Sequence, residues 1–371
     1  MRFREFNEQL IYTSFEKVIK LYRGSSPRPI INYVTTDENG VNWIKIGDMP
    51  SVGNKVFSCS EKITKDGSKK SRAVYKGDII LSNSMSFGKP YILGIDGFIH
   101  DGWFVIRDYK KYLDKTYLCQ LLSSDIVQNQ YKSTAAGGVV KNISSDLVNS
   151  VKFHLPSIIE QRKIARFLES IDQRIETQIK IIDDYNSLKM GIYNCMFKEN
   201  YADYKLKQLA YIVKGDQINN DQLLSNGSYY MMNGGTSPSG YIDSYNVSEN
   251  TISISEGGNS CGYVQFNSCP FWSGGHCYTI QNVNSALIEN KYLYHYLKYK
   301  EKEIMNLRIG TGLPNIQKKD LENFTILVPS LLIQRKNLAL FEMLDEKISI
   351  LNEELANLQK QKKYLLCNMF I

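Results

Sequence analysis

The chain carries the sequence LPSIIEQRKIARFLESIDQRIETQIKIIDDYNSLKMGIYNCMF at residues 155–197 and VPSLLIQRKNLALFEMLDEKISILNEELANLQKQKKYLLCNMF at residues 328–370. The two segments align without a gap at a shift of 173 residues, and 11 of the 43 aligned positions are identical. A repeat of this length indicates one structural unit that the chain uses twice. The identical pairs are Pro156/Pro329, Ser157/Ser330, Gln161/Gln334, Arg162/Arg335, Lys163/Lys336, Glu169/Glu342, Asp172/Asp345, Ile175/Ile348, Lys189/Lys362, Met196/Met369 and Phe197/Phe370.

Both copies show the hydrophobic spacing of a coiled coil. Residues at alternating steps of four and three are mostly apolar over more than four heptads, beginning at Ile164 in the first copy and at Asn337 in the second. Pro156 and Pro329 stand just before these runs, where a helix start tolerates proline, and no later proline interrupts either copy. The pattern predicts two helices of about 40 residues, each roughly 60 Å long. Heptads can also mark a helix that only faces a core, but two equivalent helices in one chain most simply pair with each other.

The remaining sequence forms two blocks that resemble each other weakly. VNWIKIGDM (41–49) corresponds to GSYYMMNGG (227–235), GDIILSNSMSFGK (77–89) to ENTISISEGGNSCG (249–262), and GGVVKNISSDLVNSVKFHLP (137–156) to GTGLPNIQKKDLENFTILVP (310–329). Each block reads as short strands separated by glycine-containing turns, with one or two helices. We therefore expect domains at 1–154 and 199–328 and spacer helices at 155–198 and 329–371.

Composition excludes several classes of protein. The 371 residues hold 45 Lys and Arg against 38 Asp and Glu, a net charge of +7 that permits a polyanionic partner. No apolar run is long enough to span a membrane and the first residues lack a secretory core, so we expect a cytoplasmic protein without membrane association. Its 7 cysteines are scattered, which favours reduced thiols over a disulfide framework.

Motifs for catalysis are missing from the sequence. There is no phosphate-binding GxxxxGK[ST] run, no GxGxxG turn and no Asn-Pro-Pro motif of an amino-methyltransferase. Cys261, Cys269, His276 and Cys277 lack the CxxC spacing of a structural zinc site, so we expect no metal and interpret them as small core residues. We interpret His100 and His154, which stand in apolar contexts, as packing residues.

Candidate DNA contacts lie in loops. Basic residues surround the turn-forming segment 65–69 and are suited to phosphate contacts, although a solvated loop would look the same. The loops at 82–89 and 255–260 follow equivalent strands and carry side chains that can hydrogen-bond to base edges, although plain turns share this composition. The predicted DNA-binding residues are Lys69, Lys70, Arg72, Ser82, Asn83, Ser84, Lys89, Ser255, Glu256 and Asn259.

The order of these parts resembles the DNA specificity subunit of type I restriction-modification enzymes along essentially the whole chain. The most specific local match is the Pro-x-x-x-x-Gln-Arg-Lys sequence at each helix start, residues 156–163 and 329–336. Family members often have Glu before the Gln; the first copy keeps Glu160, whereas the second has Ile333. The second domain matches the family pattern less clearly than the first.

The resemblance implies an α+β chain in which two target-recognition domains are joined by two long antiparallel helices that form a coiled coil with a pseudo-two-fold internal repeat. Each domain would read one half of a split site in double-stranded DNA. The helices would dock two modification (methyltransferase) subunits, and ATP-dependent restriction subunits would join the complex. S-adenosylmethionine, ATP and Mg²⁺ would then belong to the partners and this chain would hold no cofactor and no catalytic residue. Around the helix starts, the resemblance points to Gln161, Arg162, Lys163, Gln334, Arg335 and Lys336 as partner-binding residues.

Two other classes of protein remain as alternatives. A stand-alone DNA-processing nuclease with a helical dimerisation arm would need a carboxylate constellation for a divalent metal, and we find none that recurs. A pure coiled-coil scaffold would leave the two globular blocks without a role.

The net charge is unevenly distributed. Residues 1–154 hold 22 basic and 15 acidic side chains, whereas residues 199–328 hold 10 and 12. We therefore expect the first domain to contribute more of the salt-sensitive phosphate binding.

Overall fold

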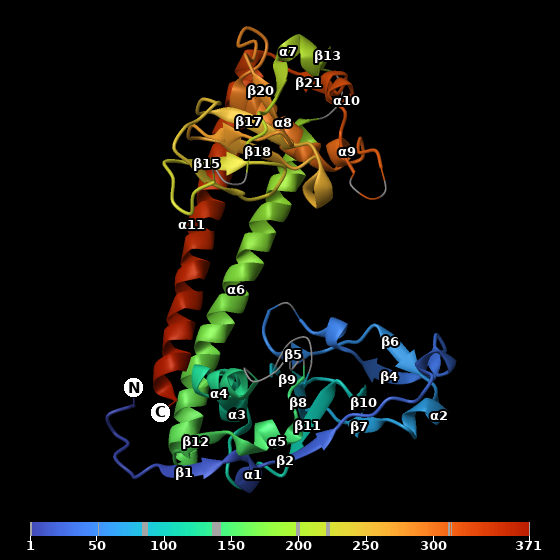
Figure 1. Ribbon diagram of the computed structural model, residues 1–371, viewed down its shortest axis with the longest axis vertical. Helices are drawn as coiled ribbons and strands as arrows, with labels where there is room; N and C mark the ends of the chain where they lie inside the picture. The colour runs from blue at the N-terminus through green and yellow to red at the C-terminus, as the bar shows by residue number, and fades with distance from the viewer. Residues whose placement is uncertain are drawn as a thin grey trace. The chain divides into compact units, whose positions relative to one another are not determined.

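The two copies of the repeat form two long helices in the computed structural model, which describes residues 2–50, 52–83, 88–135, 142–197, 201–219, 223–310, 312 and 314–370. Helix α6 runs over Ile158–Met196 and α11 over Leu331–Met369, and each has 39 residues. Both begin two residues after the proline that the sequence marks as a helix start (Figure 1). The prediction of two long helices is thus confirmed.

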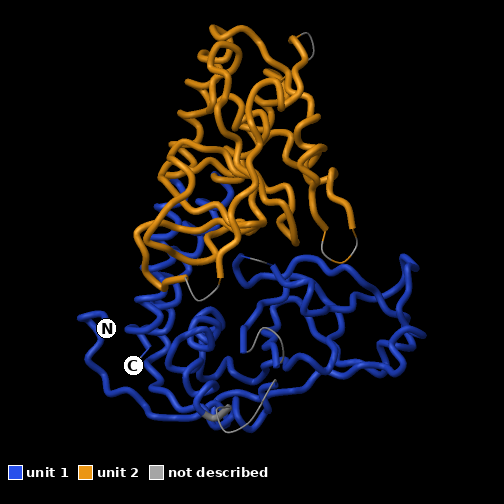
Figure 2. The backbone as a smooth tube through the Cα atoms, turned by 45° about the horizontal axis from the view of Figure 1, so that its top comes forward, with its two compact units in different colours: residues 1–181, 351–371 blue, residues 182–350 orange. Residues whose placement is uncertain are grey.

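The chain divides into two compact units, and the division falls inside both long helices. One unit contains residues 1–181 and 351–371, and the other contains residues 182–350 (Figure 2). The expected boundaries at 154/155, 198/199 and 328/329 follow the sequence repeat, whereas the compact units share each helix between them. Each unit therefore combines one globular part with a segment of each long helix.

The described residues of the first unit form three sheets. A pair β1–β12 is antiparallel; one five-stranded sheet has the order β2-β11-β8-β9-β5 and the other the order β3-β6-β4-β10-β7. The strands are β1 (Ile11–Ser14), β2 (Lys20–Arg23), β3 (Val34–Thr35), β4 (Val41–Ile44), β5 (Lys55–Val56), β6 (Glu61–Ile63), β7 (Arg72–Val74), β8 (Ile79–Ser82), β9 (Pro90–Leu93), β10 (Gly97–Ile99), β11 (Trp103–Arg107) and β12 (Lys152–Leu155). The shorter helices are α1 (Phe15–Val18), α2 (Lys65–Ser68), α3 (Lys115–Ser123), α4 (Asp125–Ala135) and α5 (Ser145–Ser150).

The second unit repeats this topology, with fewer strands among its described residues. Its sheets have the orders β13-β21, β14-β20-β17-β18 and β16-β15-β19. The strands are β13 (Ala202–Lys205), β14 (Tyr211–Lys214), β15 (Tyr229–Met232), β16 (Gly240–Ile242), β17 (Thr251–Ser255), β18 (Val264–Asn267), β19 (Trp272–Ser273), β20 (Cys277–Gln281) and β21 (Thr325–Val328). The helices are α7 (Leu206–Leu209), α8 (Asn290–Tyr299), α9 (Glu301–Met305) and α10 (Lys318–Glu322). The parallel pair β4–β10 of the first unit corresponds to the parallel pair β15–β19 here. The expected α+β class with an internal repeat is therefore confirmed.

The predicted heptad positions lie in the cores of both units. In the first unit Ile164, Leu168, Ile171 and Ile175 of α6 belong to one apolar cluster with Leu365 and Met369 of α11. In the second, Phe341 of α11 belongs to a cluster with the sheet and α8, and Ile192 and Met196 of α6 pack against that cluster. In each unit the segments of α6 and α11 run antiparallel, since contacts further along α6 reach residues earlier in α11 (Figure 1). The helices therefore contribute to the core of each unit.

Among the described residues, no helix combines the length and the apolar character that crossing a membrane requires.

Candidate nucleic-acid interface

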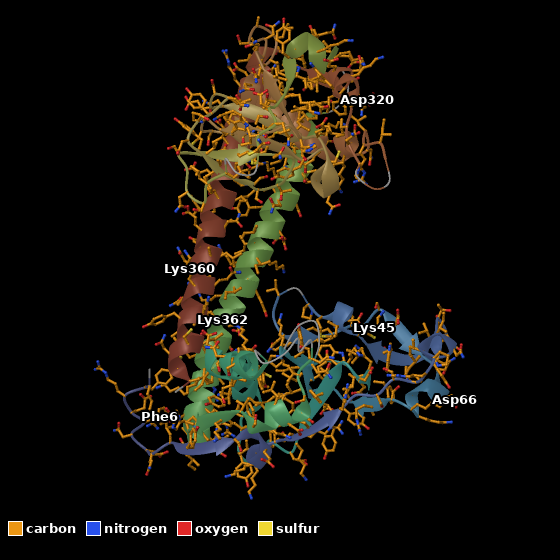
Figure 3. The ribbon with its side chains drawn as sticks, in the orientation of Figure 1. Phe6, Lys45, Asp66, Asp320, Lys360 and Lys362 are labelled. Atoms are coloured by element: carbon orange, nitrogen blue, oxygen red, sulfur yellow. The ribbon has the colours of Figure 1, made fainter. Side chains whose placement is uncertain are left out.

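The basic segment of the first unit lies at an exposed edge formed by α2 and β7. Thr64 caps α2 by accepting a hydrogen bond from the Gly67 N–H at 3.2 Å. Lys69 pairs with Asp66 at 2.8 Å, and this ion pair lowers the pKa of Asp66 and raises that of Lys69. Figure 3 shows Asp66 at the tip of this edge. Both side chains project into solvent, so the pair can open to a phosphate at small cost.

Lys70 and Arg72 extend the same edge over tyrosine rings. Lys70 Nζ donates to the Tyr33 hydroxyl at 2.5 Å and lies 4.8 Å from the centre of that ring. Arg72 Nε donates to the Arg23 carbonyl at 3.1 Å, and its guanidinium lies 5.7 Å from the Tyr22 ring. These contacts hold the cationic groups at the surface, where they suit phosphate contacts.

The loop at 82–89, the first of the two loops predicted to contact bases, begins with buried residues. Ser82 accepts the Lys89 N–H at 3.1 Å, and Asn83 donates its amide to the Asp101 carbonyl at 2.8 Å; both side chains are buried. Lys89 is exposed beside the Tyr91 ring, at 5.2 Å. Ser84 lies outside the described residues. Direct base contact by Ser82 or Asn83 would require this part of the loop to rearrange, so Lys89 is the accessible candidate.

The loop at 255–260, the second of the two, also begins with a buried residue. Ser255 is buried and donates its hydroxyl to the Gly234 carbonyl at 2.7 Å, whereas Asn259 is exposed. Each loop makes an equivalent backbone hydrogen bond. In the first, the Ile143 N–H donates to the Asn83 carbonyl at 2.7 Å; in the second, the Ile316 N–H donates to the Glu256 carbonyl at 2.9 Å. The buried members therefore fix where each loop leaves the sheet.

Glu256 holds a polar cluster at the base of the second loop. Its buried carboxylate accepts from Lys214 Nζ at 2.7 Å and from the Tyr278 hydroxyl at 3.0 Å, and His276 Nδ1 lies 3.6 Å away. Burial and this carboxylate raise the pKa of Tyr278, so the hydroxyl stays protonated and donates. Lys214 and His276 reach solvent and could meet phosphate there, a role that the sequence analysis did not predict for either residue.

Gln161 fastens the first long helix to its domain. It lies in the first turn of α6 and is 1% exposed. Its amide donates to the carbonyls of Tyr112 at 2.9 Å and Pro156 at 3.0 Å, and its oxygen accepts the Asp114 N–H at 2.9 Å. Asp114 is the N-cap of α3, so the glutamine joins the start of α6 to the start of α3.

Gln334 makes the same three bonds in the second unit. It is 0% exposed, donates to the carbonyls of Leu287 and Pro329 at 2.8 Å each, and accepts the Glu289 N–H at 2.8 Å. Glu289 is the N-cap of α8. Both glutamines are buried and use both amide N–H groups inside the chain, so in this conformation their side chains are not exposed to a partner.

The other residues predicted for partner binding are exposed. These are Arg162, Lys163, Arg335 and Lys336. Arg335 Nε donates to a Glu289 carboxylate oxygen at 2.8 Å, and Lys163 pairs with Glu5. Their partner-binding role stays a prediction.

Two equivalent ion pairs join the long helices, and the sequence alone did not single them out. Lys362 of α11 pairs with Asp172 of α6 in the first unit, and Lys189 of α6 pairs with Asp345 of α11 in the second. Lys362 is labelled on α11 in Figure 3. All four residues belong to identical pairs of the repeat, and that identity was the available signal.

Each ion pair is also linked to its globular part. Gln120 of α3 donates to Asp172 at 2.8 Å. In the second unit the corresponding residue is His295 of α8, whose Nδ1 lies 3.9 Å from Asp345 and 2.8 Å from the Tyr193 hydroxyl. Burial, with Lys189 and Lys291 nearby, lowers the pKa of His295 to about 3, so this imidazole is neutral at pH 7.

The cysteines and histidines do not gather into a ligand set. Among the described residues, no group of three or more His, Cys, Asp or Glu side chains is arranged to hold a metal ion. Cys261 and Cys277 are buried, as expected of core residues, whereas Cys269 and His276 are exposed, so that interpretation is wrong for these two; all cysteines in the described part of the chain are free. His100 is half-buried, and burial lowers its pKa.

Comparison with known proteins identifies the family. Residues 20–183 and 198–360 each match the Type I restriction modification DNA specificity domain. A putative type I specificity subunit of Mycoplasma pneumoniae is 34% identical over 155 residues, which are 42% of this chain and 41% of that protein. The putative type I restriction enzyme MjaX specificity subunit of Methanocaldococcus jannaschii is 25% identical over 328 residues, 78% of this chain and 76% of that protein.

The fold has a counterpart among solved structures. The S subunit of a type I restriction-modification system from M. genitalium superimposes with a TM-score of 0.64 at 18% identity, covering 99% of this chain and 98% of that chain. This likeness concerns the fold alone. The family itself is shown by the match of residues 20–183 and 198–360 to the DNA specificity domain. The chain therefore belongs to the type I restriction-modification DNA specificity subunits and carries the domain of that family twice.

Proposed function

We propose that this chain is the non-catalytic subunit that gives a type I restriction-modification complex its DNA sequence specificity. Each globular part reads one half of a split site in double-stranded DNA, and the paired helices set the number of unspecified base pairs between the halves. Methyl transfer and ATP-driven restriction then belong to partner subunits, which hold S-adenosylmethionine, ATP and Mg²⁺. The complex acts in the cytoplasm, where its DNA is.

One observation carries this proposal: the same attachment of a globular part to a helix start occurs twice. Gln161 and Gln334 make equivalent sets of three hydrogen bonds, and the Lys362–Asp172 and Lys189–Asp345 pairs repeat across the two helices. The attachment is the same in both units, whereas the loops at 82–89 and 255–260 differ in sequence. This suits two domains that are held by the helices in the same way but recognise different DNA sequences. The basic edge at Lys69, Lys70 and Arg72 supports phosphate binding by the first reader.

Exchange of one reader tests the proposal. Residues 1–154 are replaced by the corresponding part of another family member, and the methylated motifs are sequenced in cells that also produce the modification and restriction subunits. We expect one half of the split motif to change while the other half and the gap stay the same. A motif that is unchanged, or altered in both halves, would contradict the assignment of one half-site to each part.

The same cells separate this function from that of a nuclease that acts alone. We expect no Mg²⁺-dependent cleavage by the purified chain without its partners, and sustained cleavage by the chain alone would contradict the proposal.

A further inference from the structure

The N-terminal residues 2–8, here called the strap, lie along the start of α6 in the first unit. Arg2 Nε and Nη2 donate to the two carboxylate oxygens of Glu160 at 2.7 Å each, and Arg2 Nη1 donates to the Glu8 carbonyl at 2.7 Å. Glu160 is 1% exposed, so this bidentate pair is formed largely away from water. The pair fastens one end of the strap to the helix.

Aromatic contacts hold the rest of the strap. The Phe3 ring packs edge-on against Phe167 with 6.0 Å between centroids, and Lys163 Nζ lies 4.6 Å from the Phe3 ring and 5.9 Å from the Phe6 ring. Lys163 also pairs with Glu5. Figure 3 places Phe6 beside the beginning of α6. The strap thus covers the helix face that carries Glu160, Lys163 and Phe167.

The equivalent face of α11 in the second unit has different chemistry. Ile333 stands at the position of Glu160 and is 37% exposed, and Met343 stands at the position of Ser170 and is 59% exposed. Ile350, one heptad after Met343, is 44% exposed. Leu340, at the position of Phe167, completes a stripe whose spacing of seven, three and seven residues is that of a coiled-coil seam. An exposed stripe of this kind suits a partner helix with its own apolar stripe.

We propose that the strap closes one of two equivalent docking faces, so that the two modification subunits bind unequally. The first docks a helix on the open face of α11, and the second must displace the strap from α6. The inference rests on the proposed function, because that function names the partner. The observation behind it is the asymmetry itself: the repeat keeps Gln161 and Gln334 alike, but it pairs Glu160 with the strap and replaces it by an exposed Ile333.

A closed strap weakens docking in proportion to the time it is closed. The apparent dissociation constant equals the intrinsic one divided by the fraction of open molecules. A strap closed about 90% of the time therefore weakens the second step on the order of 10-fold. The first step is unaffected, because the strap contacts α6 and the first step uses α11.

The test titrates the full chain with its modification subunit and follows the one- and two-subunit complexes by native mass spectrometry and calorimetry. Two dissociation constants are expected for the unmodified chain, the second weaker after the statistical factor for two sites is removed. The double variant Phe3→Ala/Phe6→Ala should strengthen the second step on the order of 10-fold and leave the first unchanged. Arg4→Ala, an exposed residue within the strap, is the matched control and should change neither step.

A second pair of variants guards against misfolding of the strap variant. Arg2→Ala/Glu160→Ile gives the first face the residue of the second and should also strengthen the second step. Met343→Lys/Ile350→Lys should weaken the first step and leave the second. Equal intrinsic constants in the unmodified chain, or a second step weakened by loss of the strap, would overturn the inference. If the two modification subunits bound with equal constants and the complex still methylated a split site, only the role of the strap would be contradicted. If no complex formed at all, the proposed function would be contradicted.

Discussion

A buried glutamine that makes three hydrogen bonds has no adequate replacement among the other side chains. Gln161 and Gln334 each satisfy two backbone carbonyls and one N–H at the junction of a long helix and a short one. Asn is too short to span these groups, and Glu would lack the two donors. The Gln in the repeated Gln-Arg-Lys sequence is therefore a structural requirement at a buried joint, while Arg and Lys beside it stay exposed.

Truncation of either glutamine should destabilise the unit that contains it. We expect Gln161→Ala and Gln334→Ala each to lower the free energy of unfolding by about 3 kcal/mol, because three buried backbone groups lose their partner. Urea denaturation followed by circular dichroism measures the change. Gln359→Ala, an exposed glutamine on α11, serves as the control and should cost less than about 0.5 kcal/mol. If the free energy of unfolding fell by no more than in the control, the glutamines would not have this structural role.

His295 should make the second unit sensitive to mild acid. Its pKa is lowered to about 3 in the folded chain, whereas an unfolded histidine titrates near pH 6.5. Between these values the unfolded state binds a proton that the folded state does not, so stability falls as the pH falls below about 6.5. We expect a loss of about 2 kcal/mol between pH 7 and pH 5 from this residue.

The substitution His295→Gln should remove that part of the pH dependence, because glutamine does not titrate. Gln120 occupies the corresponding place in the first unit, so a glutamine suits this position. Thermal unfolding at pH 7 and pH 5 compares the two chains. Gln359→Ala, at an exposed glutamine of α11 that does not titrate, is the control and should leave the pH dependence as it is. An identical acid response in the unmodified chain and in the His295→Gln variant would contradict the expectation.

The long helices are the elements that the sequence defines best. A heptad pattern over more than four repeats and a proline before each copy are strong local signals, and both helices begin within three residues of those prolines. The strands were less accessible. VNWIKIGDM (41–49) reads as a short β run that ends in turn residues, and β4 indeed ends at Ile44 before a 3₁₀ turn at Ile46–Asp48, but the residue at which the strand stops could not be read from the sequence.

Burial in the loops could not be predicted from local sequence. Ser82, Asn83, Ser255 and Glu256 have the composition of exposed turns, but all four are buried. Their surroundings come from distant segments, since Asp101 binds Asn83 and Tyr278 binds Glu256. The exposed candidates Lys69, Lys70, Arg72, Lys89 and Asn259 agree better with the predicted contacts, because exposure of charged and polar side chains is the usual outcome.

Longer helices should widen the recognised site. We expect insertion of one heptad after Lys180 and one after Glu353, equivalent positions of the repeat, to add about 10 Å of helix, which corresponds to about 3 base pairs. Methylome sequencing should report the same half-sites with a larger gap. Insertion in α6 alone should abolish methylation, because the Lys189–Asp345 and Lys362–Asp172 pairs cannot both form. A changed half-site with an unchanged gap would contradict the role of the helices.

At the scale of the whole molecule, charge distinguishes two halves that topology makes similar. The excess of seven positive charges in residues 1–154 contrasts with an excess of two negative charges in residues 199–328. Phosphate binding releases counterions in proportion to the number of contacts, so the first globular part should account for most of the salt dependence.

Neutralising the basic edge should measure this share. We expect Lys69→Gln, Lys70→Gln and Arg72→Gln together to reduce the slope of log K against log salt by about two to three in the assembled complex. Fluorescence anisotropy with the methylated motif at several salt concentrations gives the slope. The control replaces Lys180, Lys347 and Lys360, which are exposed on the helices, by Gln and should leave the slope unchanged. Equal effects of the two triple variants would contradict the charge argument.

The division of the compact units inside the long helices has a consequence for biosynthesis. Residues 182–350 are contiguous, so that unit can assemble once its own stretch of chain has left the ribosome. The other unit needs residues 351–371, and Leu365, Met369 and Phe370 lie in its core with Leu168 and Ile171. Domains usually fold in the order of their synthesis. Here residues 1–154 are translated before residues 182–350, yet the apolar stripe of α6 in their unit stays uncovered until residues 351–371 are translated, so that unit is completed after the other.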